Sequence, residues 1–151
     1  MTVPVATAPR RARRADLASA RALLRSAGLP LAGVEEHFDG FWTVHATHHR
    51  LAGVAGSERY GASWLLRSLA VDPSFRGHGI GSALLATFVG EARRLGARAI
   101  LLLTTDADDF FAARGFRVVP RAAAPDALRA SEELRGACPD SATLMRLEVS
   151  P

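Results

Sequence analysis

Lysine, asparagine and glutamine do not occur in this 151-residue chain, and cysteine occurs once, as Cys138. A single cysteine excludes an internal disulfide and any metal site that needs several thiolates. The absence of lysine also excludes a Walker-type nucleotide loop, which requires a lysine after its last glycine. No apolar run approaches the ~20 residues of a membrane-spanning helix, so we expect a cytoplasmic protein that does not contact a membrane.

Arginine carries all of the fixed positive charge, and 19 basic against 15 acidic residues give a net charge of +4. The arginines are spread along the chain, and aromatic residues do not interleave with them as a base-stacking surface requires. We therefore expect no nucleic-acid partner and interpret the arginine content as a compositional bias. A modest positive field would still attract a polyanionic cofactor.

The length and the hydrophobic pattern predict one mixed α/β domain over residues 10–151, preceded by a disordered segment over residues 1–9. Asp16 is the expected N-cap of the first helix, and Gly28, Gly96 and Gly115 are expected to end three helices. The expected strands cover 10–14, 41–45, 51–59, 63–71, 99–103, 116–119 and 142–149, and the expected helices cover 16–27, 34–38, 79–95, 106–114 and 125–135.

Residues 65–81 contain the strongest local pattern of the chain. A strand-length apolar run stops at Asp72-Pro73, and a basic turn with Gly77, Gly79 and Gly81 leads into a segment of helical periodicity. A glycine turn at a helix N-terminus forms an anion site, because free N–H groups and the helix dipole both favour negative charge there. The alternate glycines do not fit a dinucleotide fingerprint, which has the pattern Gly-x-Gly-x-x-Gly.

The pattern that does fit is Arg76-x-x-Gly79-x-Gly81, which resembles the pyrophosphate-binding motif of the GNAT superfamily of acetyl-CoA-dependent N-acetyltransferases. A second motif, from Ala107 through Phe110 and Phe111 to Gly115-Phe116, resembles that family's Ala-x-x-Phe-Tyr-x-x-x-Gly-Phe. The resemblance implies a central mixed, mostly antiparallel sheet flanked by helices, with acetyl-CoA as cosubstrate. Short stretches around 66–71, 103–105, 128–131 and 138–142 further resemble the GNAT subgroup of bacterial arsenic-resistance operons, which is linked in part with acetylation of amino-acid-like toxins.

The resemblance also implies a set of cofactor-binding residues. The pantetheine arm would pair with the edge of the strand that contains Leu69, like an added strand. The pyrophosphate would lie on the N–H groups of the glycine turn, and Thr104 stands where many relatives carry asparagine. The implied cofactor-binding residues are Leu69, Ala70, Val71, Arg76, Gly77, His78, Gly79, Ile80, Gly81, Thr104, Phe110 and Phe111.

Three residues are candidates for the catalytic steps. Glu58 precedes the cofactor strand and is the first choice for the base; the alternative is an ion-paired or solvated glutamate beside Arg59. A backbone N–H at Leu69 or Ala70 could stabilise the oxyanion, and Ser68 could orient the substrate or simply pack. The family tyrosine that often protonates the leaving thiolate is replaced by Phe111, so the general acid is not identified.

Arg67 and Arg129 are candidates to hold a substrate carboxylate, with a structural or surface role as the alternative for each. His45, His48 and His49 surround an expected turn without a supporting carboxylate pattern, so we expect no metal. For Cys138 we favour packing or proximity to substrate over a nucleophilic role, because no histidine base is placed near it.

The leading hypothesis is an N-acetyltransferase that acts on a small primary amine, such as an amino acid or a toxic amino-acid analogue. A protein or peptide N-acetyltransferase is the enzymatic alternative, and a non-catalytic acyl-CoA-binding sensor is the alternative of a different class. Dimers are common among such relatives, and nothing in the sequence decides the oligomeric state.

Overall fold

The computed structural model describes residues 8–150, apart from the side chain of His48. Residues 1–7, which make up most of the segment expected to be disordered, lie outside this part. The chain divides into two compact units, Met1–Ser57 with Ser68–Phe88, and Glu58–Arg67 with Val89–Pro151. We call them unit 1 and unit 2 and describe each by itself; the expectation of one domain over 10–151 stays a prediction.

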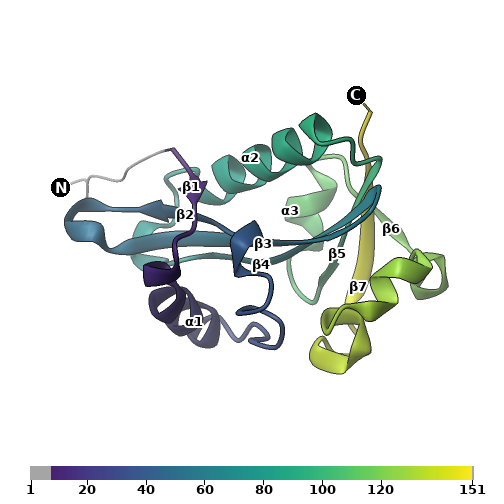
Figure 1. Cartoon of the computed structure of the whole chain (residues 1–151), viewed down its shortest axis with the longest axis horizontal. Helices are drawn as coiled ribbons and strands as arrows, with labels where there is room; N and C mark the ends of the chain where they lie inside the picture. The colour runs from purple at the N-terminus through teal and green to yellow at the C-terminus, as the bar shows by residue number, and fades with distance from the viewer. Residues whose placement is uncertain (1–7, 151) are drawn as a thin grey trace. The chain divides into compact units, whose positions relative to one another are not determined.

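Within the described residues, seven strands pair in the order β1-β2-β3-β4-β5-β7-β6 (Figure 1). The pairs β1–β2, β2–β3, β5–β7 and β6–β7 are antiparallel, whereas β4 and β5 pair in parallel. The expected mixed, mostly antiparallel sheet is therefore confirmed. The strands are β1 Arg10–Arg11, β2 Trp42–His45, β3 Leu51–Tyr60, β4 Ser63–Val71, β5 Ala99–Thr104, β6 Arg117–Val119 and β7 Thr143–Glu148.

In unit 1, helices cover both faces of β3. Ala20 and Leu24 of α1, Leu17–Ser26, are fully buried in one apolar cluster with Val54. The neighbouring Gly53 points the other way, because successive strand residues face opposite sides. A Cβ on Gly53 would lie 2.7 Å from Ile80 and 3.1 Å from Leu84 of α2, Ile80–Arg94. Glycine here lets α2 lie close against the strand.

In unit 2, the apolar core forms around β5, with β7 between β5 and β6 (Figure 1). Most of the β5 side chains are buried, as a continuous apolar run predicts for a strand covered on both faces. Leu101, Leu144 and Leu128 are each at most 1% exposed and belong to one cluster. The third helix, α3 Asp108–Ala112, ends before Gly115.

The three α-helices end in the same way, at the glycines that the sequence analysis singled out. After α1, Gly28 has φ +72°, Leu29 N–H donates to Leu24 O over 2.9 Å, and Gly28 N–H donates to Arg25 O over 3.1 Å. This pair of bonds is a Schellman motif, which needs a left-handed residue that glycine supplies without steric cost. Gly96 and Gly115 have φ +90° and +95° and close α2 and α3 with the equivalent bonds.

Two expected helices are wrong, and Asp16 occupies the expected N-cap position without the expected side-chain bond. Residues 34–38 form turns followed by a 3₁₀ turn at Phe38–Gly40, because so short a segment cannot nucleate a helix and is held by the burial of Val34 and Phe38. Residues 125–135 form a 3₁₀ turn, Asp126–Ala130, and a separate π-type turn, Glu133–Ala137. Asp16 makes no side-chain capping bond to α1 and instead accepts the Arg13 N–H over 2.8 Å.

The break within 125–135 has a local cause. Ser131 is extended, with φ −71° and ψ 137°, and its Oγ accepts the Glu133 N–H over 3.2 Å. A serine that bonds the backbone two residues further on competes with continuous helix. The break orients Glu133 into the interior of unit 2, where it is 4% exposed.

Candidate active site

The turn between β4 and α2 is the first candidate part of the site and belongs to unit 1. Asp72 Oδ1 accepts the Ser74 N–H over 2.8 Å, which starts a 3₁₀ turn at Pro73–Phe75. Gly77 and Gly79 follow with φ +83° and +76°, and both are exposed. A Cβ built on either glycine would meet no protein atom within 4 Å, so the backbone is open on that side. This geometry suits a phosphate group that lies directly on main-chain N–H groups at a helix N-terminus.

Arg50 stabilises the start of this turn through an ion pair and a contact with an aromatic ring. Arg50 Nη2 lies 3.2 Å from Asp72 Oδ2, and the Arg50 guanidinium lies 5.2 Å from the centre of the Phe75 ring. Burial alone would raise the pKa of Asp72, but hydrogen bonds from Ser74 and Arg50 hold it below its ordinary value. Phe75 is 2% exposed and anchors the turn in the interior of unit 1. Arg76 and His78 are exposed and able to approach a ligand.

The backbone of strand β4 departs from regular extended geometry at Ser68. Parallel pairing with β5 runs from Ser63↔Ala99 to Leu65↔Leu101. Ser68, within the continuous strand, then adopts φ +59°, a left-handed conformation that is rare for a residue other than glycine. Its side chain is buried, so packing is part of its role. Beyond it, Ala70 packs into the apolar cluster of unit 1, and Leu69 and Val71 are half-buried.

Glu58, the candidate base, lies in a buried polar cluster of unit 2. Its Oε2 accepts from Arg67 Nη1 over 2.7 Å, and its Oε1 accepts from the Tyr60 hydroxyl over 2.5 Å. The side chains of Glu58 and Arg67 are both 0% exposed. Glu58 therefore forms an ion pair with Arg67, whereas the Arg59 guanidinium lies 4.3 Å from the centre of the Trp64 ring.

Arg67 is shared between two carboxylates. Its Nη2 lies 3.7 Å from Oε2 of Glu133, whose side chain is 5% exposed. A substrate carboxylate would have to compete with both glutamates for this guanidinium. The role of Arg67 as a substrate anchor stays a prediction. Arg129, the second candidate anchor, is 55% exposed and pairs with Asp126 over 3.5 Å.

Sequence reasoning missed Tyr60 and Glu133. Tyr60 is the only tyrosine of the chain and follows Glu58 by two residues on one strand, so the period of two already placed both on one face. Burial raises the pKa of Tyr60 to about 12, helped by the bond to Glu58, so its hydroxyl remains a donor at neutral pH. Glu133 had no comparable signal, because its position depends on the break at Ser131.

Cys138 lies against Glu133 in the same cluster. Burial raises the pKa of the Cys138 thiol to about 12, and the neighbouring Glu133 carboxylate adds to the effect. A thiol that stays protonated at neutral pH is a poor nucleophile. These observations agree with the expectation that Cys138 is not a nucleophile.

The remaining implied cofactor contacts in unit 2 also have structural partners. The Thr104 Oγ1 accepts the Ala107 N–H over 2.9 Å, which leaves its hydroxyl proton able to bond elsewhere. Phe111 is 6% exposed, with its ring centre 5.1 Å from Phe110 and 5.5 Å from Phe116 in edge-to-face geometry. Phe111 therefore packs in the interior of unit 2, and the contact of these residues with a cofactor stays a prediction.

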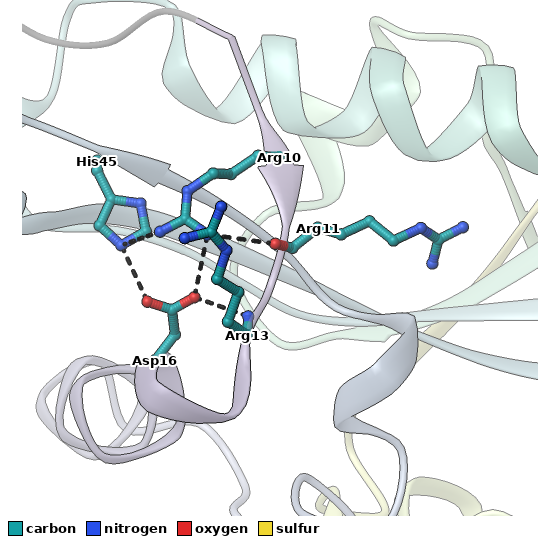
Figure 2. A network of polar contacts seen from close by, with 5 residues as sticks. All are labelled: Arg10, Arg11, Arg13, Asp16 and His45. Carbon is teal, nitrogen blue, oxygen red and sulfur yellow. Dashed lines mark hydrogen bonds and ion pairs between the residues drawn. The ribbon is translucent and has the colours of Figure 1, made fainter.

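A second polar network lies in unit 1, around His45 (Figure 2). His45 Nε2 lies 3.2 Å from Asp16 Oδ1 and 3.3 Å from Arg10 Nη2, and Arg10 Nη1 lies 3.5 Å from Asp16 Oδ2. Burial is the main cause that lowers the pKa of His45, and the Arg10 charge lowers it further. The network ties β1, the segment before α1 and β2 together.

Over residues 8–150, apart from the His48 side chain, no group of three or more His, Cys, Asp or Glu side chains is arranged to hold a metal ion. The same described residues include no helix that is long and apolar enough to span a membrane.

Comparison with known proteins supports an assignment. The family model "Acetyltransferase (GNAT) family" matches residues 10–116. N-acetylglutamate synthase from Neisseria gonorrhoeae, in complex with coenzyme A and N-acetyl-glutamate, is similar over 100% of this chain with a TM-score of 0.82 and 23% identity. This chain covers only 36% of that protein. A search of curated protein sequences found no match.

Two further structures match over nearly their whole length. Rv2747 from Mycobacterium tuberculosis, in complex with CoA and NLQ, has a TM-score of 0.78 and 21% identity over 93% of this chain and 98% of its own. The ribosomal-protein-S18-alanine N-acetyltransferase from Escherichia coli has a TM-score of 0.69 and 17% identity over 95% and 94%. At these identities the structures show a shared fold.

Proposed function

This chain belongs to the acetyltransferase (GNAT) family, and on that premise we propose that it transfers the acetyl group of acetyl-CoA to the primary amine of a small molecule. The family that the two sequence motifs indicate is confirmed by the family match, and acetyl-CoA is the cosubstrate that this family implies. The observation that carries the proposal is the exposed turn of residues 76–79, with two left-handed glycines ahead of the N-terminus of α2 at Ile80.

The turn fits the pyrophosphate of such a cosubstrate. The space where Cβ atoms would stand on Gly77 and Gly79 is open, and the first N–H groups of α2 have no partner within the helix. The N–H groups of Gly79, Ile80 and Gly81 would hold the phosphates, with Arg76 and His78 beside them. The cosubstrate supplies an acetyl thioester, whose carbonyl carbon accepts the amine nitrogen as the C–S bond breaks.

The chain's own residues would perform three tasks in this reaction. The Leu69 N–H would donate to the thioester carbonyl oxygen as negative charge develops on it. Ser68 would orient the acceptor. Glu58 would take the proton that the acceptor ammonium must lose before its nitrogen can attack. Since each carboxylate oxygen has two lone pairs, Glu58 keeps acceptor capacity beside Tyr60 and Arg67 and receives the proton through a water molecule.

For the acceptor, we propose an amino acid or a toxic amino-acid analogue. One of the similar structures supports this choice, since N-acetylglutamate synthase from Neisseria gonorrhoeae is described with N-acetyl-glutamate. The resemblance of 66–71 and 128–131 to the arsenic-resistance subgroup points the same way. Arg67 and Arg129 are the proposed partners of the acceptor carboxylate, with Arg129 the more accessible of the two.

A protein N-terminus is the second candidate acceptor, because the ribosomal-protein-S18-alanine N-acetyltransferase shares the fold. The test is a panel of free amino acids, phosphinothricin-type analogues and peptides that begin with alanine, incubated with acetyl-CoA and the purified protein. We expect CoA release with at least one free amino acid or analogue and none with the peptides. Turnover with peptides alone would contradict the small-molecule proposal, and binding of acetyl-CoA without any turnover would indicate a sensor.

A further inference from the structure

Four side chains of unit 2 form one continuous polar chain. The Tyr60 hydroxyl donates to Oε1 of Glu58, Arg67 Nη1 donates to Oε2 of the same carboxylate, and Arg67 Nη2 lies 3.7 Å from Glu133. The Glu58 and Arg67 side chains are 0% exposed and that of Glu133 is 5% exposed. These residues come from β3, from β4 and from the turn Glu133–Ala137.

The charges of these four side chains do not balance. One guanidinium faces two carboxylates, so the cluster carries one excess negative charge when both are ionised. Burial raises the pKa of Glu133, the Arg67 charge and the bond with the Cys138 thiol oppose this rise, and the Glu58 charge adds a smaller upward effect. Glu133 and Glu58 thus compete for the same arginine, and each disfavours the ionised form of the other.

We propose that Glu133 and Tyr60 are positioning residues that set the basicity of Glu58 in opposite directions. Glu133 draws the Arg67 charge away from Glu58 and adds negative charge nearby, and both effects make the Glu58 carboxylate a stronger base. Tyr60 donates a hydrogen bond to that carboxylate, which fixes its rotamer and makes it a weaker base. This inference rests on the proposed role of Glu58 in the proposed function.

Other groups contact these four side chains, and a test must leave those groups unchanged. The Cys138 thiol bonds to Glu133, and the Arg121 charge acts on that thiol from the turn Arg121–Ala123. The Ser131 hydroxyl bonds to Tyr60. None of these groups is changed in the variants below.

The experiment compares kcat/KM against pH for the wild-type protein, Glu133→Gln and Tyr60→Phe. Glu133→Gln removes a charge without changing shape, and we expect the acidic limb of its profile to move about one pH unit lower. Tyr60→Phe removes only the hydroxyl, and we expect the limb to move about one pH unit higher. Since both residues act on a proton-transfer step, kcat should change more than KM.

The matched control is Glu132→Gln, at the adjacent residue, whose side chain is 52% exposed and lies 3.9 Å from Arg135. Its acidic limb should coincide with that of the wild type. Glu133→Asp keeps the charge, so the acidic limb of its profile should stay close to that of the wild type. A merely structural role of Glu133 would not require this result. Coincident profiles of the wild type and a folded Glu133→Gln variant would overturn the inference, as would shifts of both variants in one direction.

A second measurement does not depend on turnover. Because Tyr60 is the only tyrosine, the near-ultraviolet absorbance of tyrosinate reports its ionisation alone. In the wild type we expect a titration near the raised pKa of about 12, and in Glu58→Gln a titration at lower pH, because the carboxylate that opposes ionisation is gone. An unchanged titration would overturn the network. A wild-type protein without turnover would overturn the proposed function and this inference together, whereas turnover with unshifted variants would overturn this inference alone.

Discussion

Arg67 donates from Nη1 to Oε2 of Glu58 over 2.7 Å, and both side chains are completely buried. Removal of one partner from a buried pair leaves an uncompensated charge in the interior, which costs far more than the intact pair contributes. The cost should be larger here than for an isolated pair, since Glu133 also depends on this guanidinium.

The first prediction concerns stability. Arg67→Met should lower the free energy of unfolding by about 3–5 kcal/mol, because two buried carboxylates lose their counter-charge. Urea denaturation measures the difference. The control is Arg117→Met, whose pair with Glu148 is about two-thirds exposed on both sides and should contribute about 0–1 kcal/mol. Equal losses in the two variants would contradict the importance of the buried pair, and the result also decides whether lost activity in Arg67 variants reflects folding.

The second prediction concerns the glycine turn. Gly79→Ala should lower stability by about 1 kcal/mol, because φ +76° is unfavourable for a residue with a Cβ, and should weaken CoA binding about tenfold. Gly28→Ala is a matched control, since Gly28 has φ +72° and equally open surroundings but lies after α1. Calorimetric titration with CoA should find only Gly79→Ala impaired. Equal CoA affinity in both variants would argue against the turn as the phosphate site.

The third prediction concerns Cys138. With the pKa of its thiol raised to about 12, only about one thiol in ten thousand is ionised at pH 8. An alkylating reagent should therefore label the native protein far more slowly than the urea-unfolded protein. Native labelling at the unfolded rate would show a reactive thiol and reopen the question of a nucleophilic role.

The fourth prediction concerns the pH dependence of stability around His45 (Figure 2). Its folded-state pKa is lowered from 6.5, mainly by burial, so the unfolded chain binds more protons than the folded one in this range. The stability linked to His45 is therefore fully present above about pH 6.5 and is lost as the pH falls toward the folded-state pKa.

Unfolding free energies of wild type and His45→Gln, measured from about pH 7.5 to 5.5, should show a steeper decline in the wild type. The control is the same substitution at an exposed histidine, His78→Gln. A decline of equal steepness in His45→Gln would contradict the assignment.

The fold was predictable wherever one local signal was enough. The expected strand 63–71 coincides with β4, since an apolar run ends there at proline, and Gly28, Gly96 and Gly115 end helices as expected. The glycine turn before α2 is also in the expected place. In each case, neighbouring residues determine the backbone without help from distant ones.

Prediction failed where the structure depends on tertiary packing. The helix expected over 125–135 breaks at Ser131, and Glu133 turns inward to meet Arg67, which no local pattern indicates. Arg67 pairs with two glutamates, while its role as a substrate anchor stays a prediction. The bond between Tyr60 and Glu58 was missed, although the strand period places both residues on one face. The position of Glu133 beside Arg67 therefore depends on charge pairing between segments far apart in sequence, which a local sequence pattern does not predict.

The most direct measurement is transfer of an isotopically labelled acetyl group from acetyl-CoA to a free amino acid or amino-acid analogue, followed by mass spectrometry. We expect an N-acetylated product that carries the label, formed in step with free CoA and strongly reduced in a folded Glu58→Gln variant. Labelled product at the wild-type rate in that variant would contradict the role of Glu58. If no amine of the panel gains the label while acetyl-CoA binds, the account of this chain as an N-acetyltransferase of small amines is wrong.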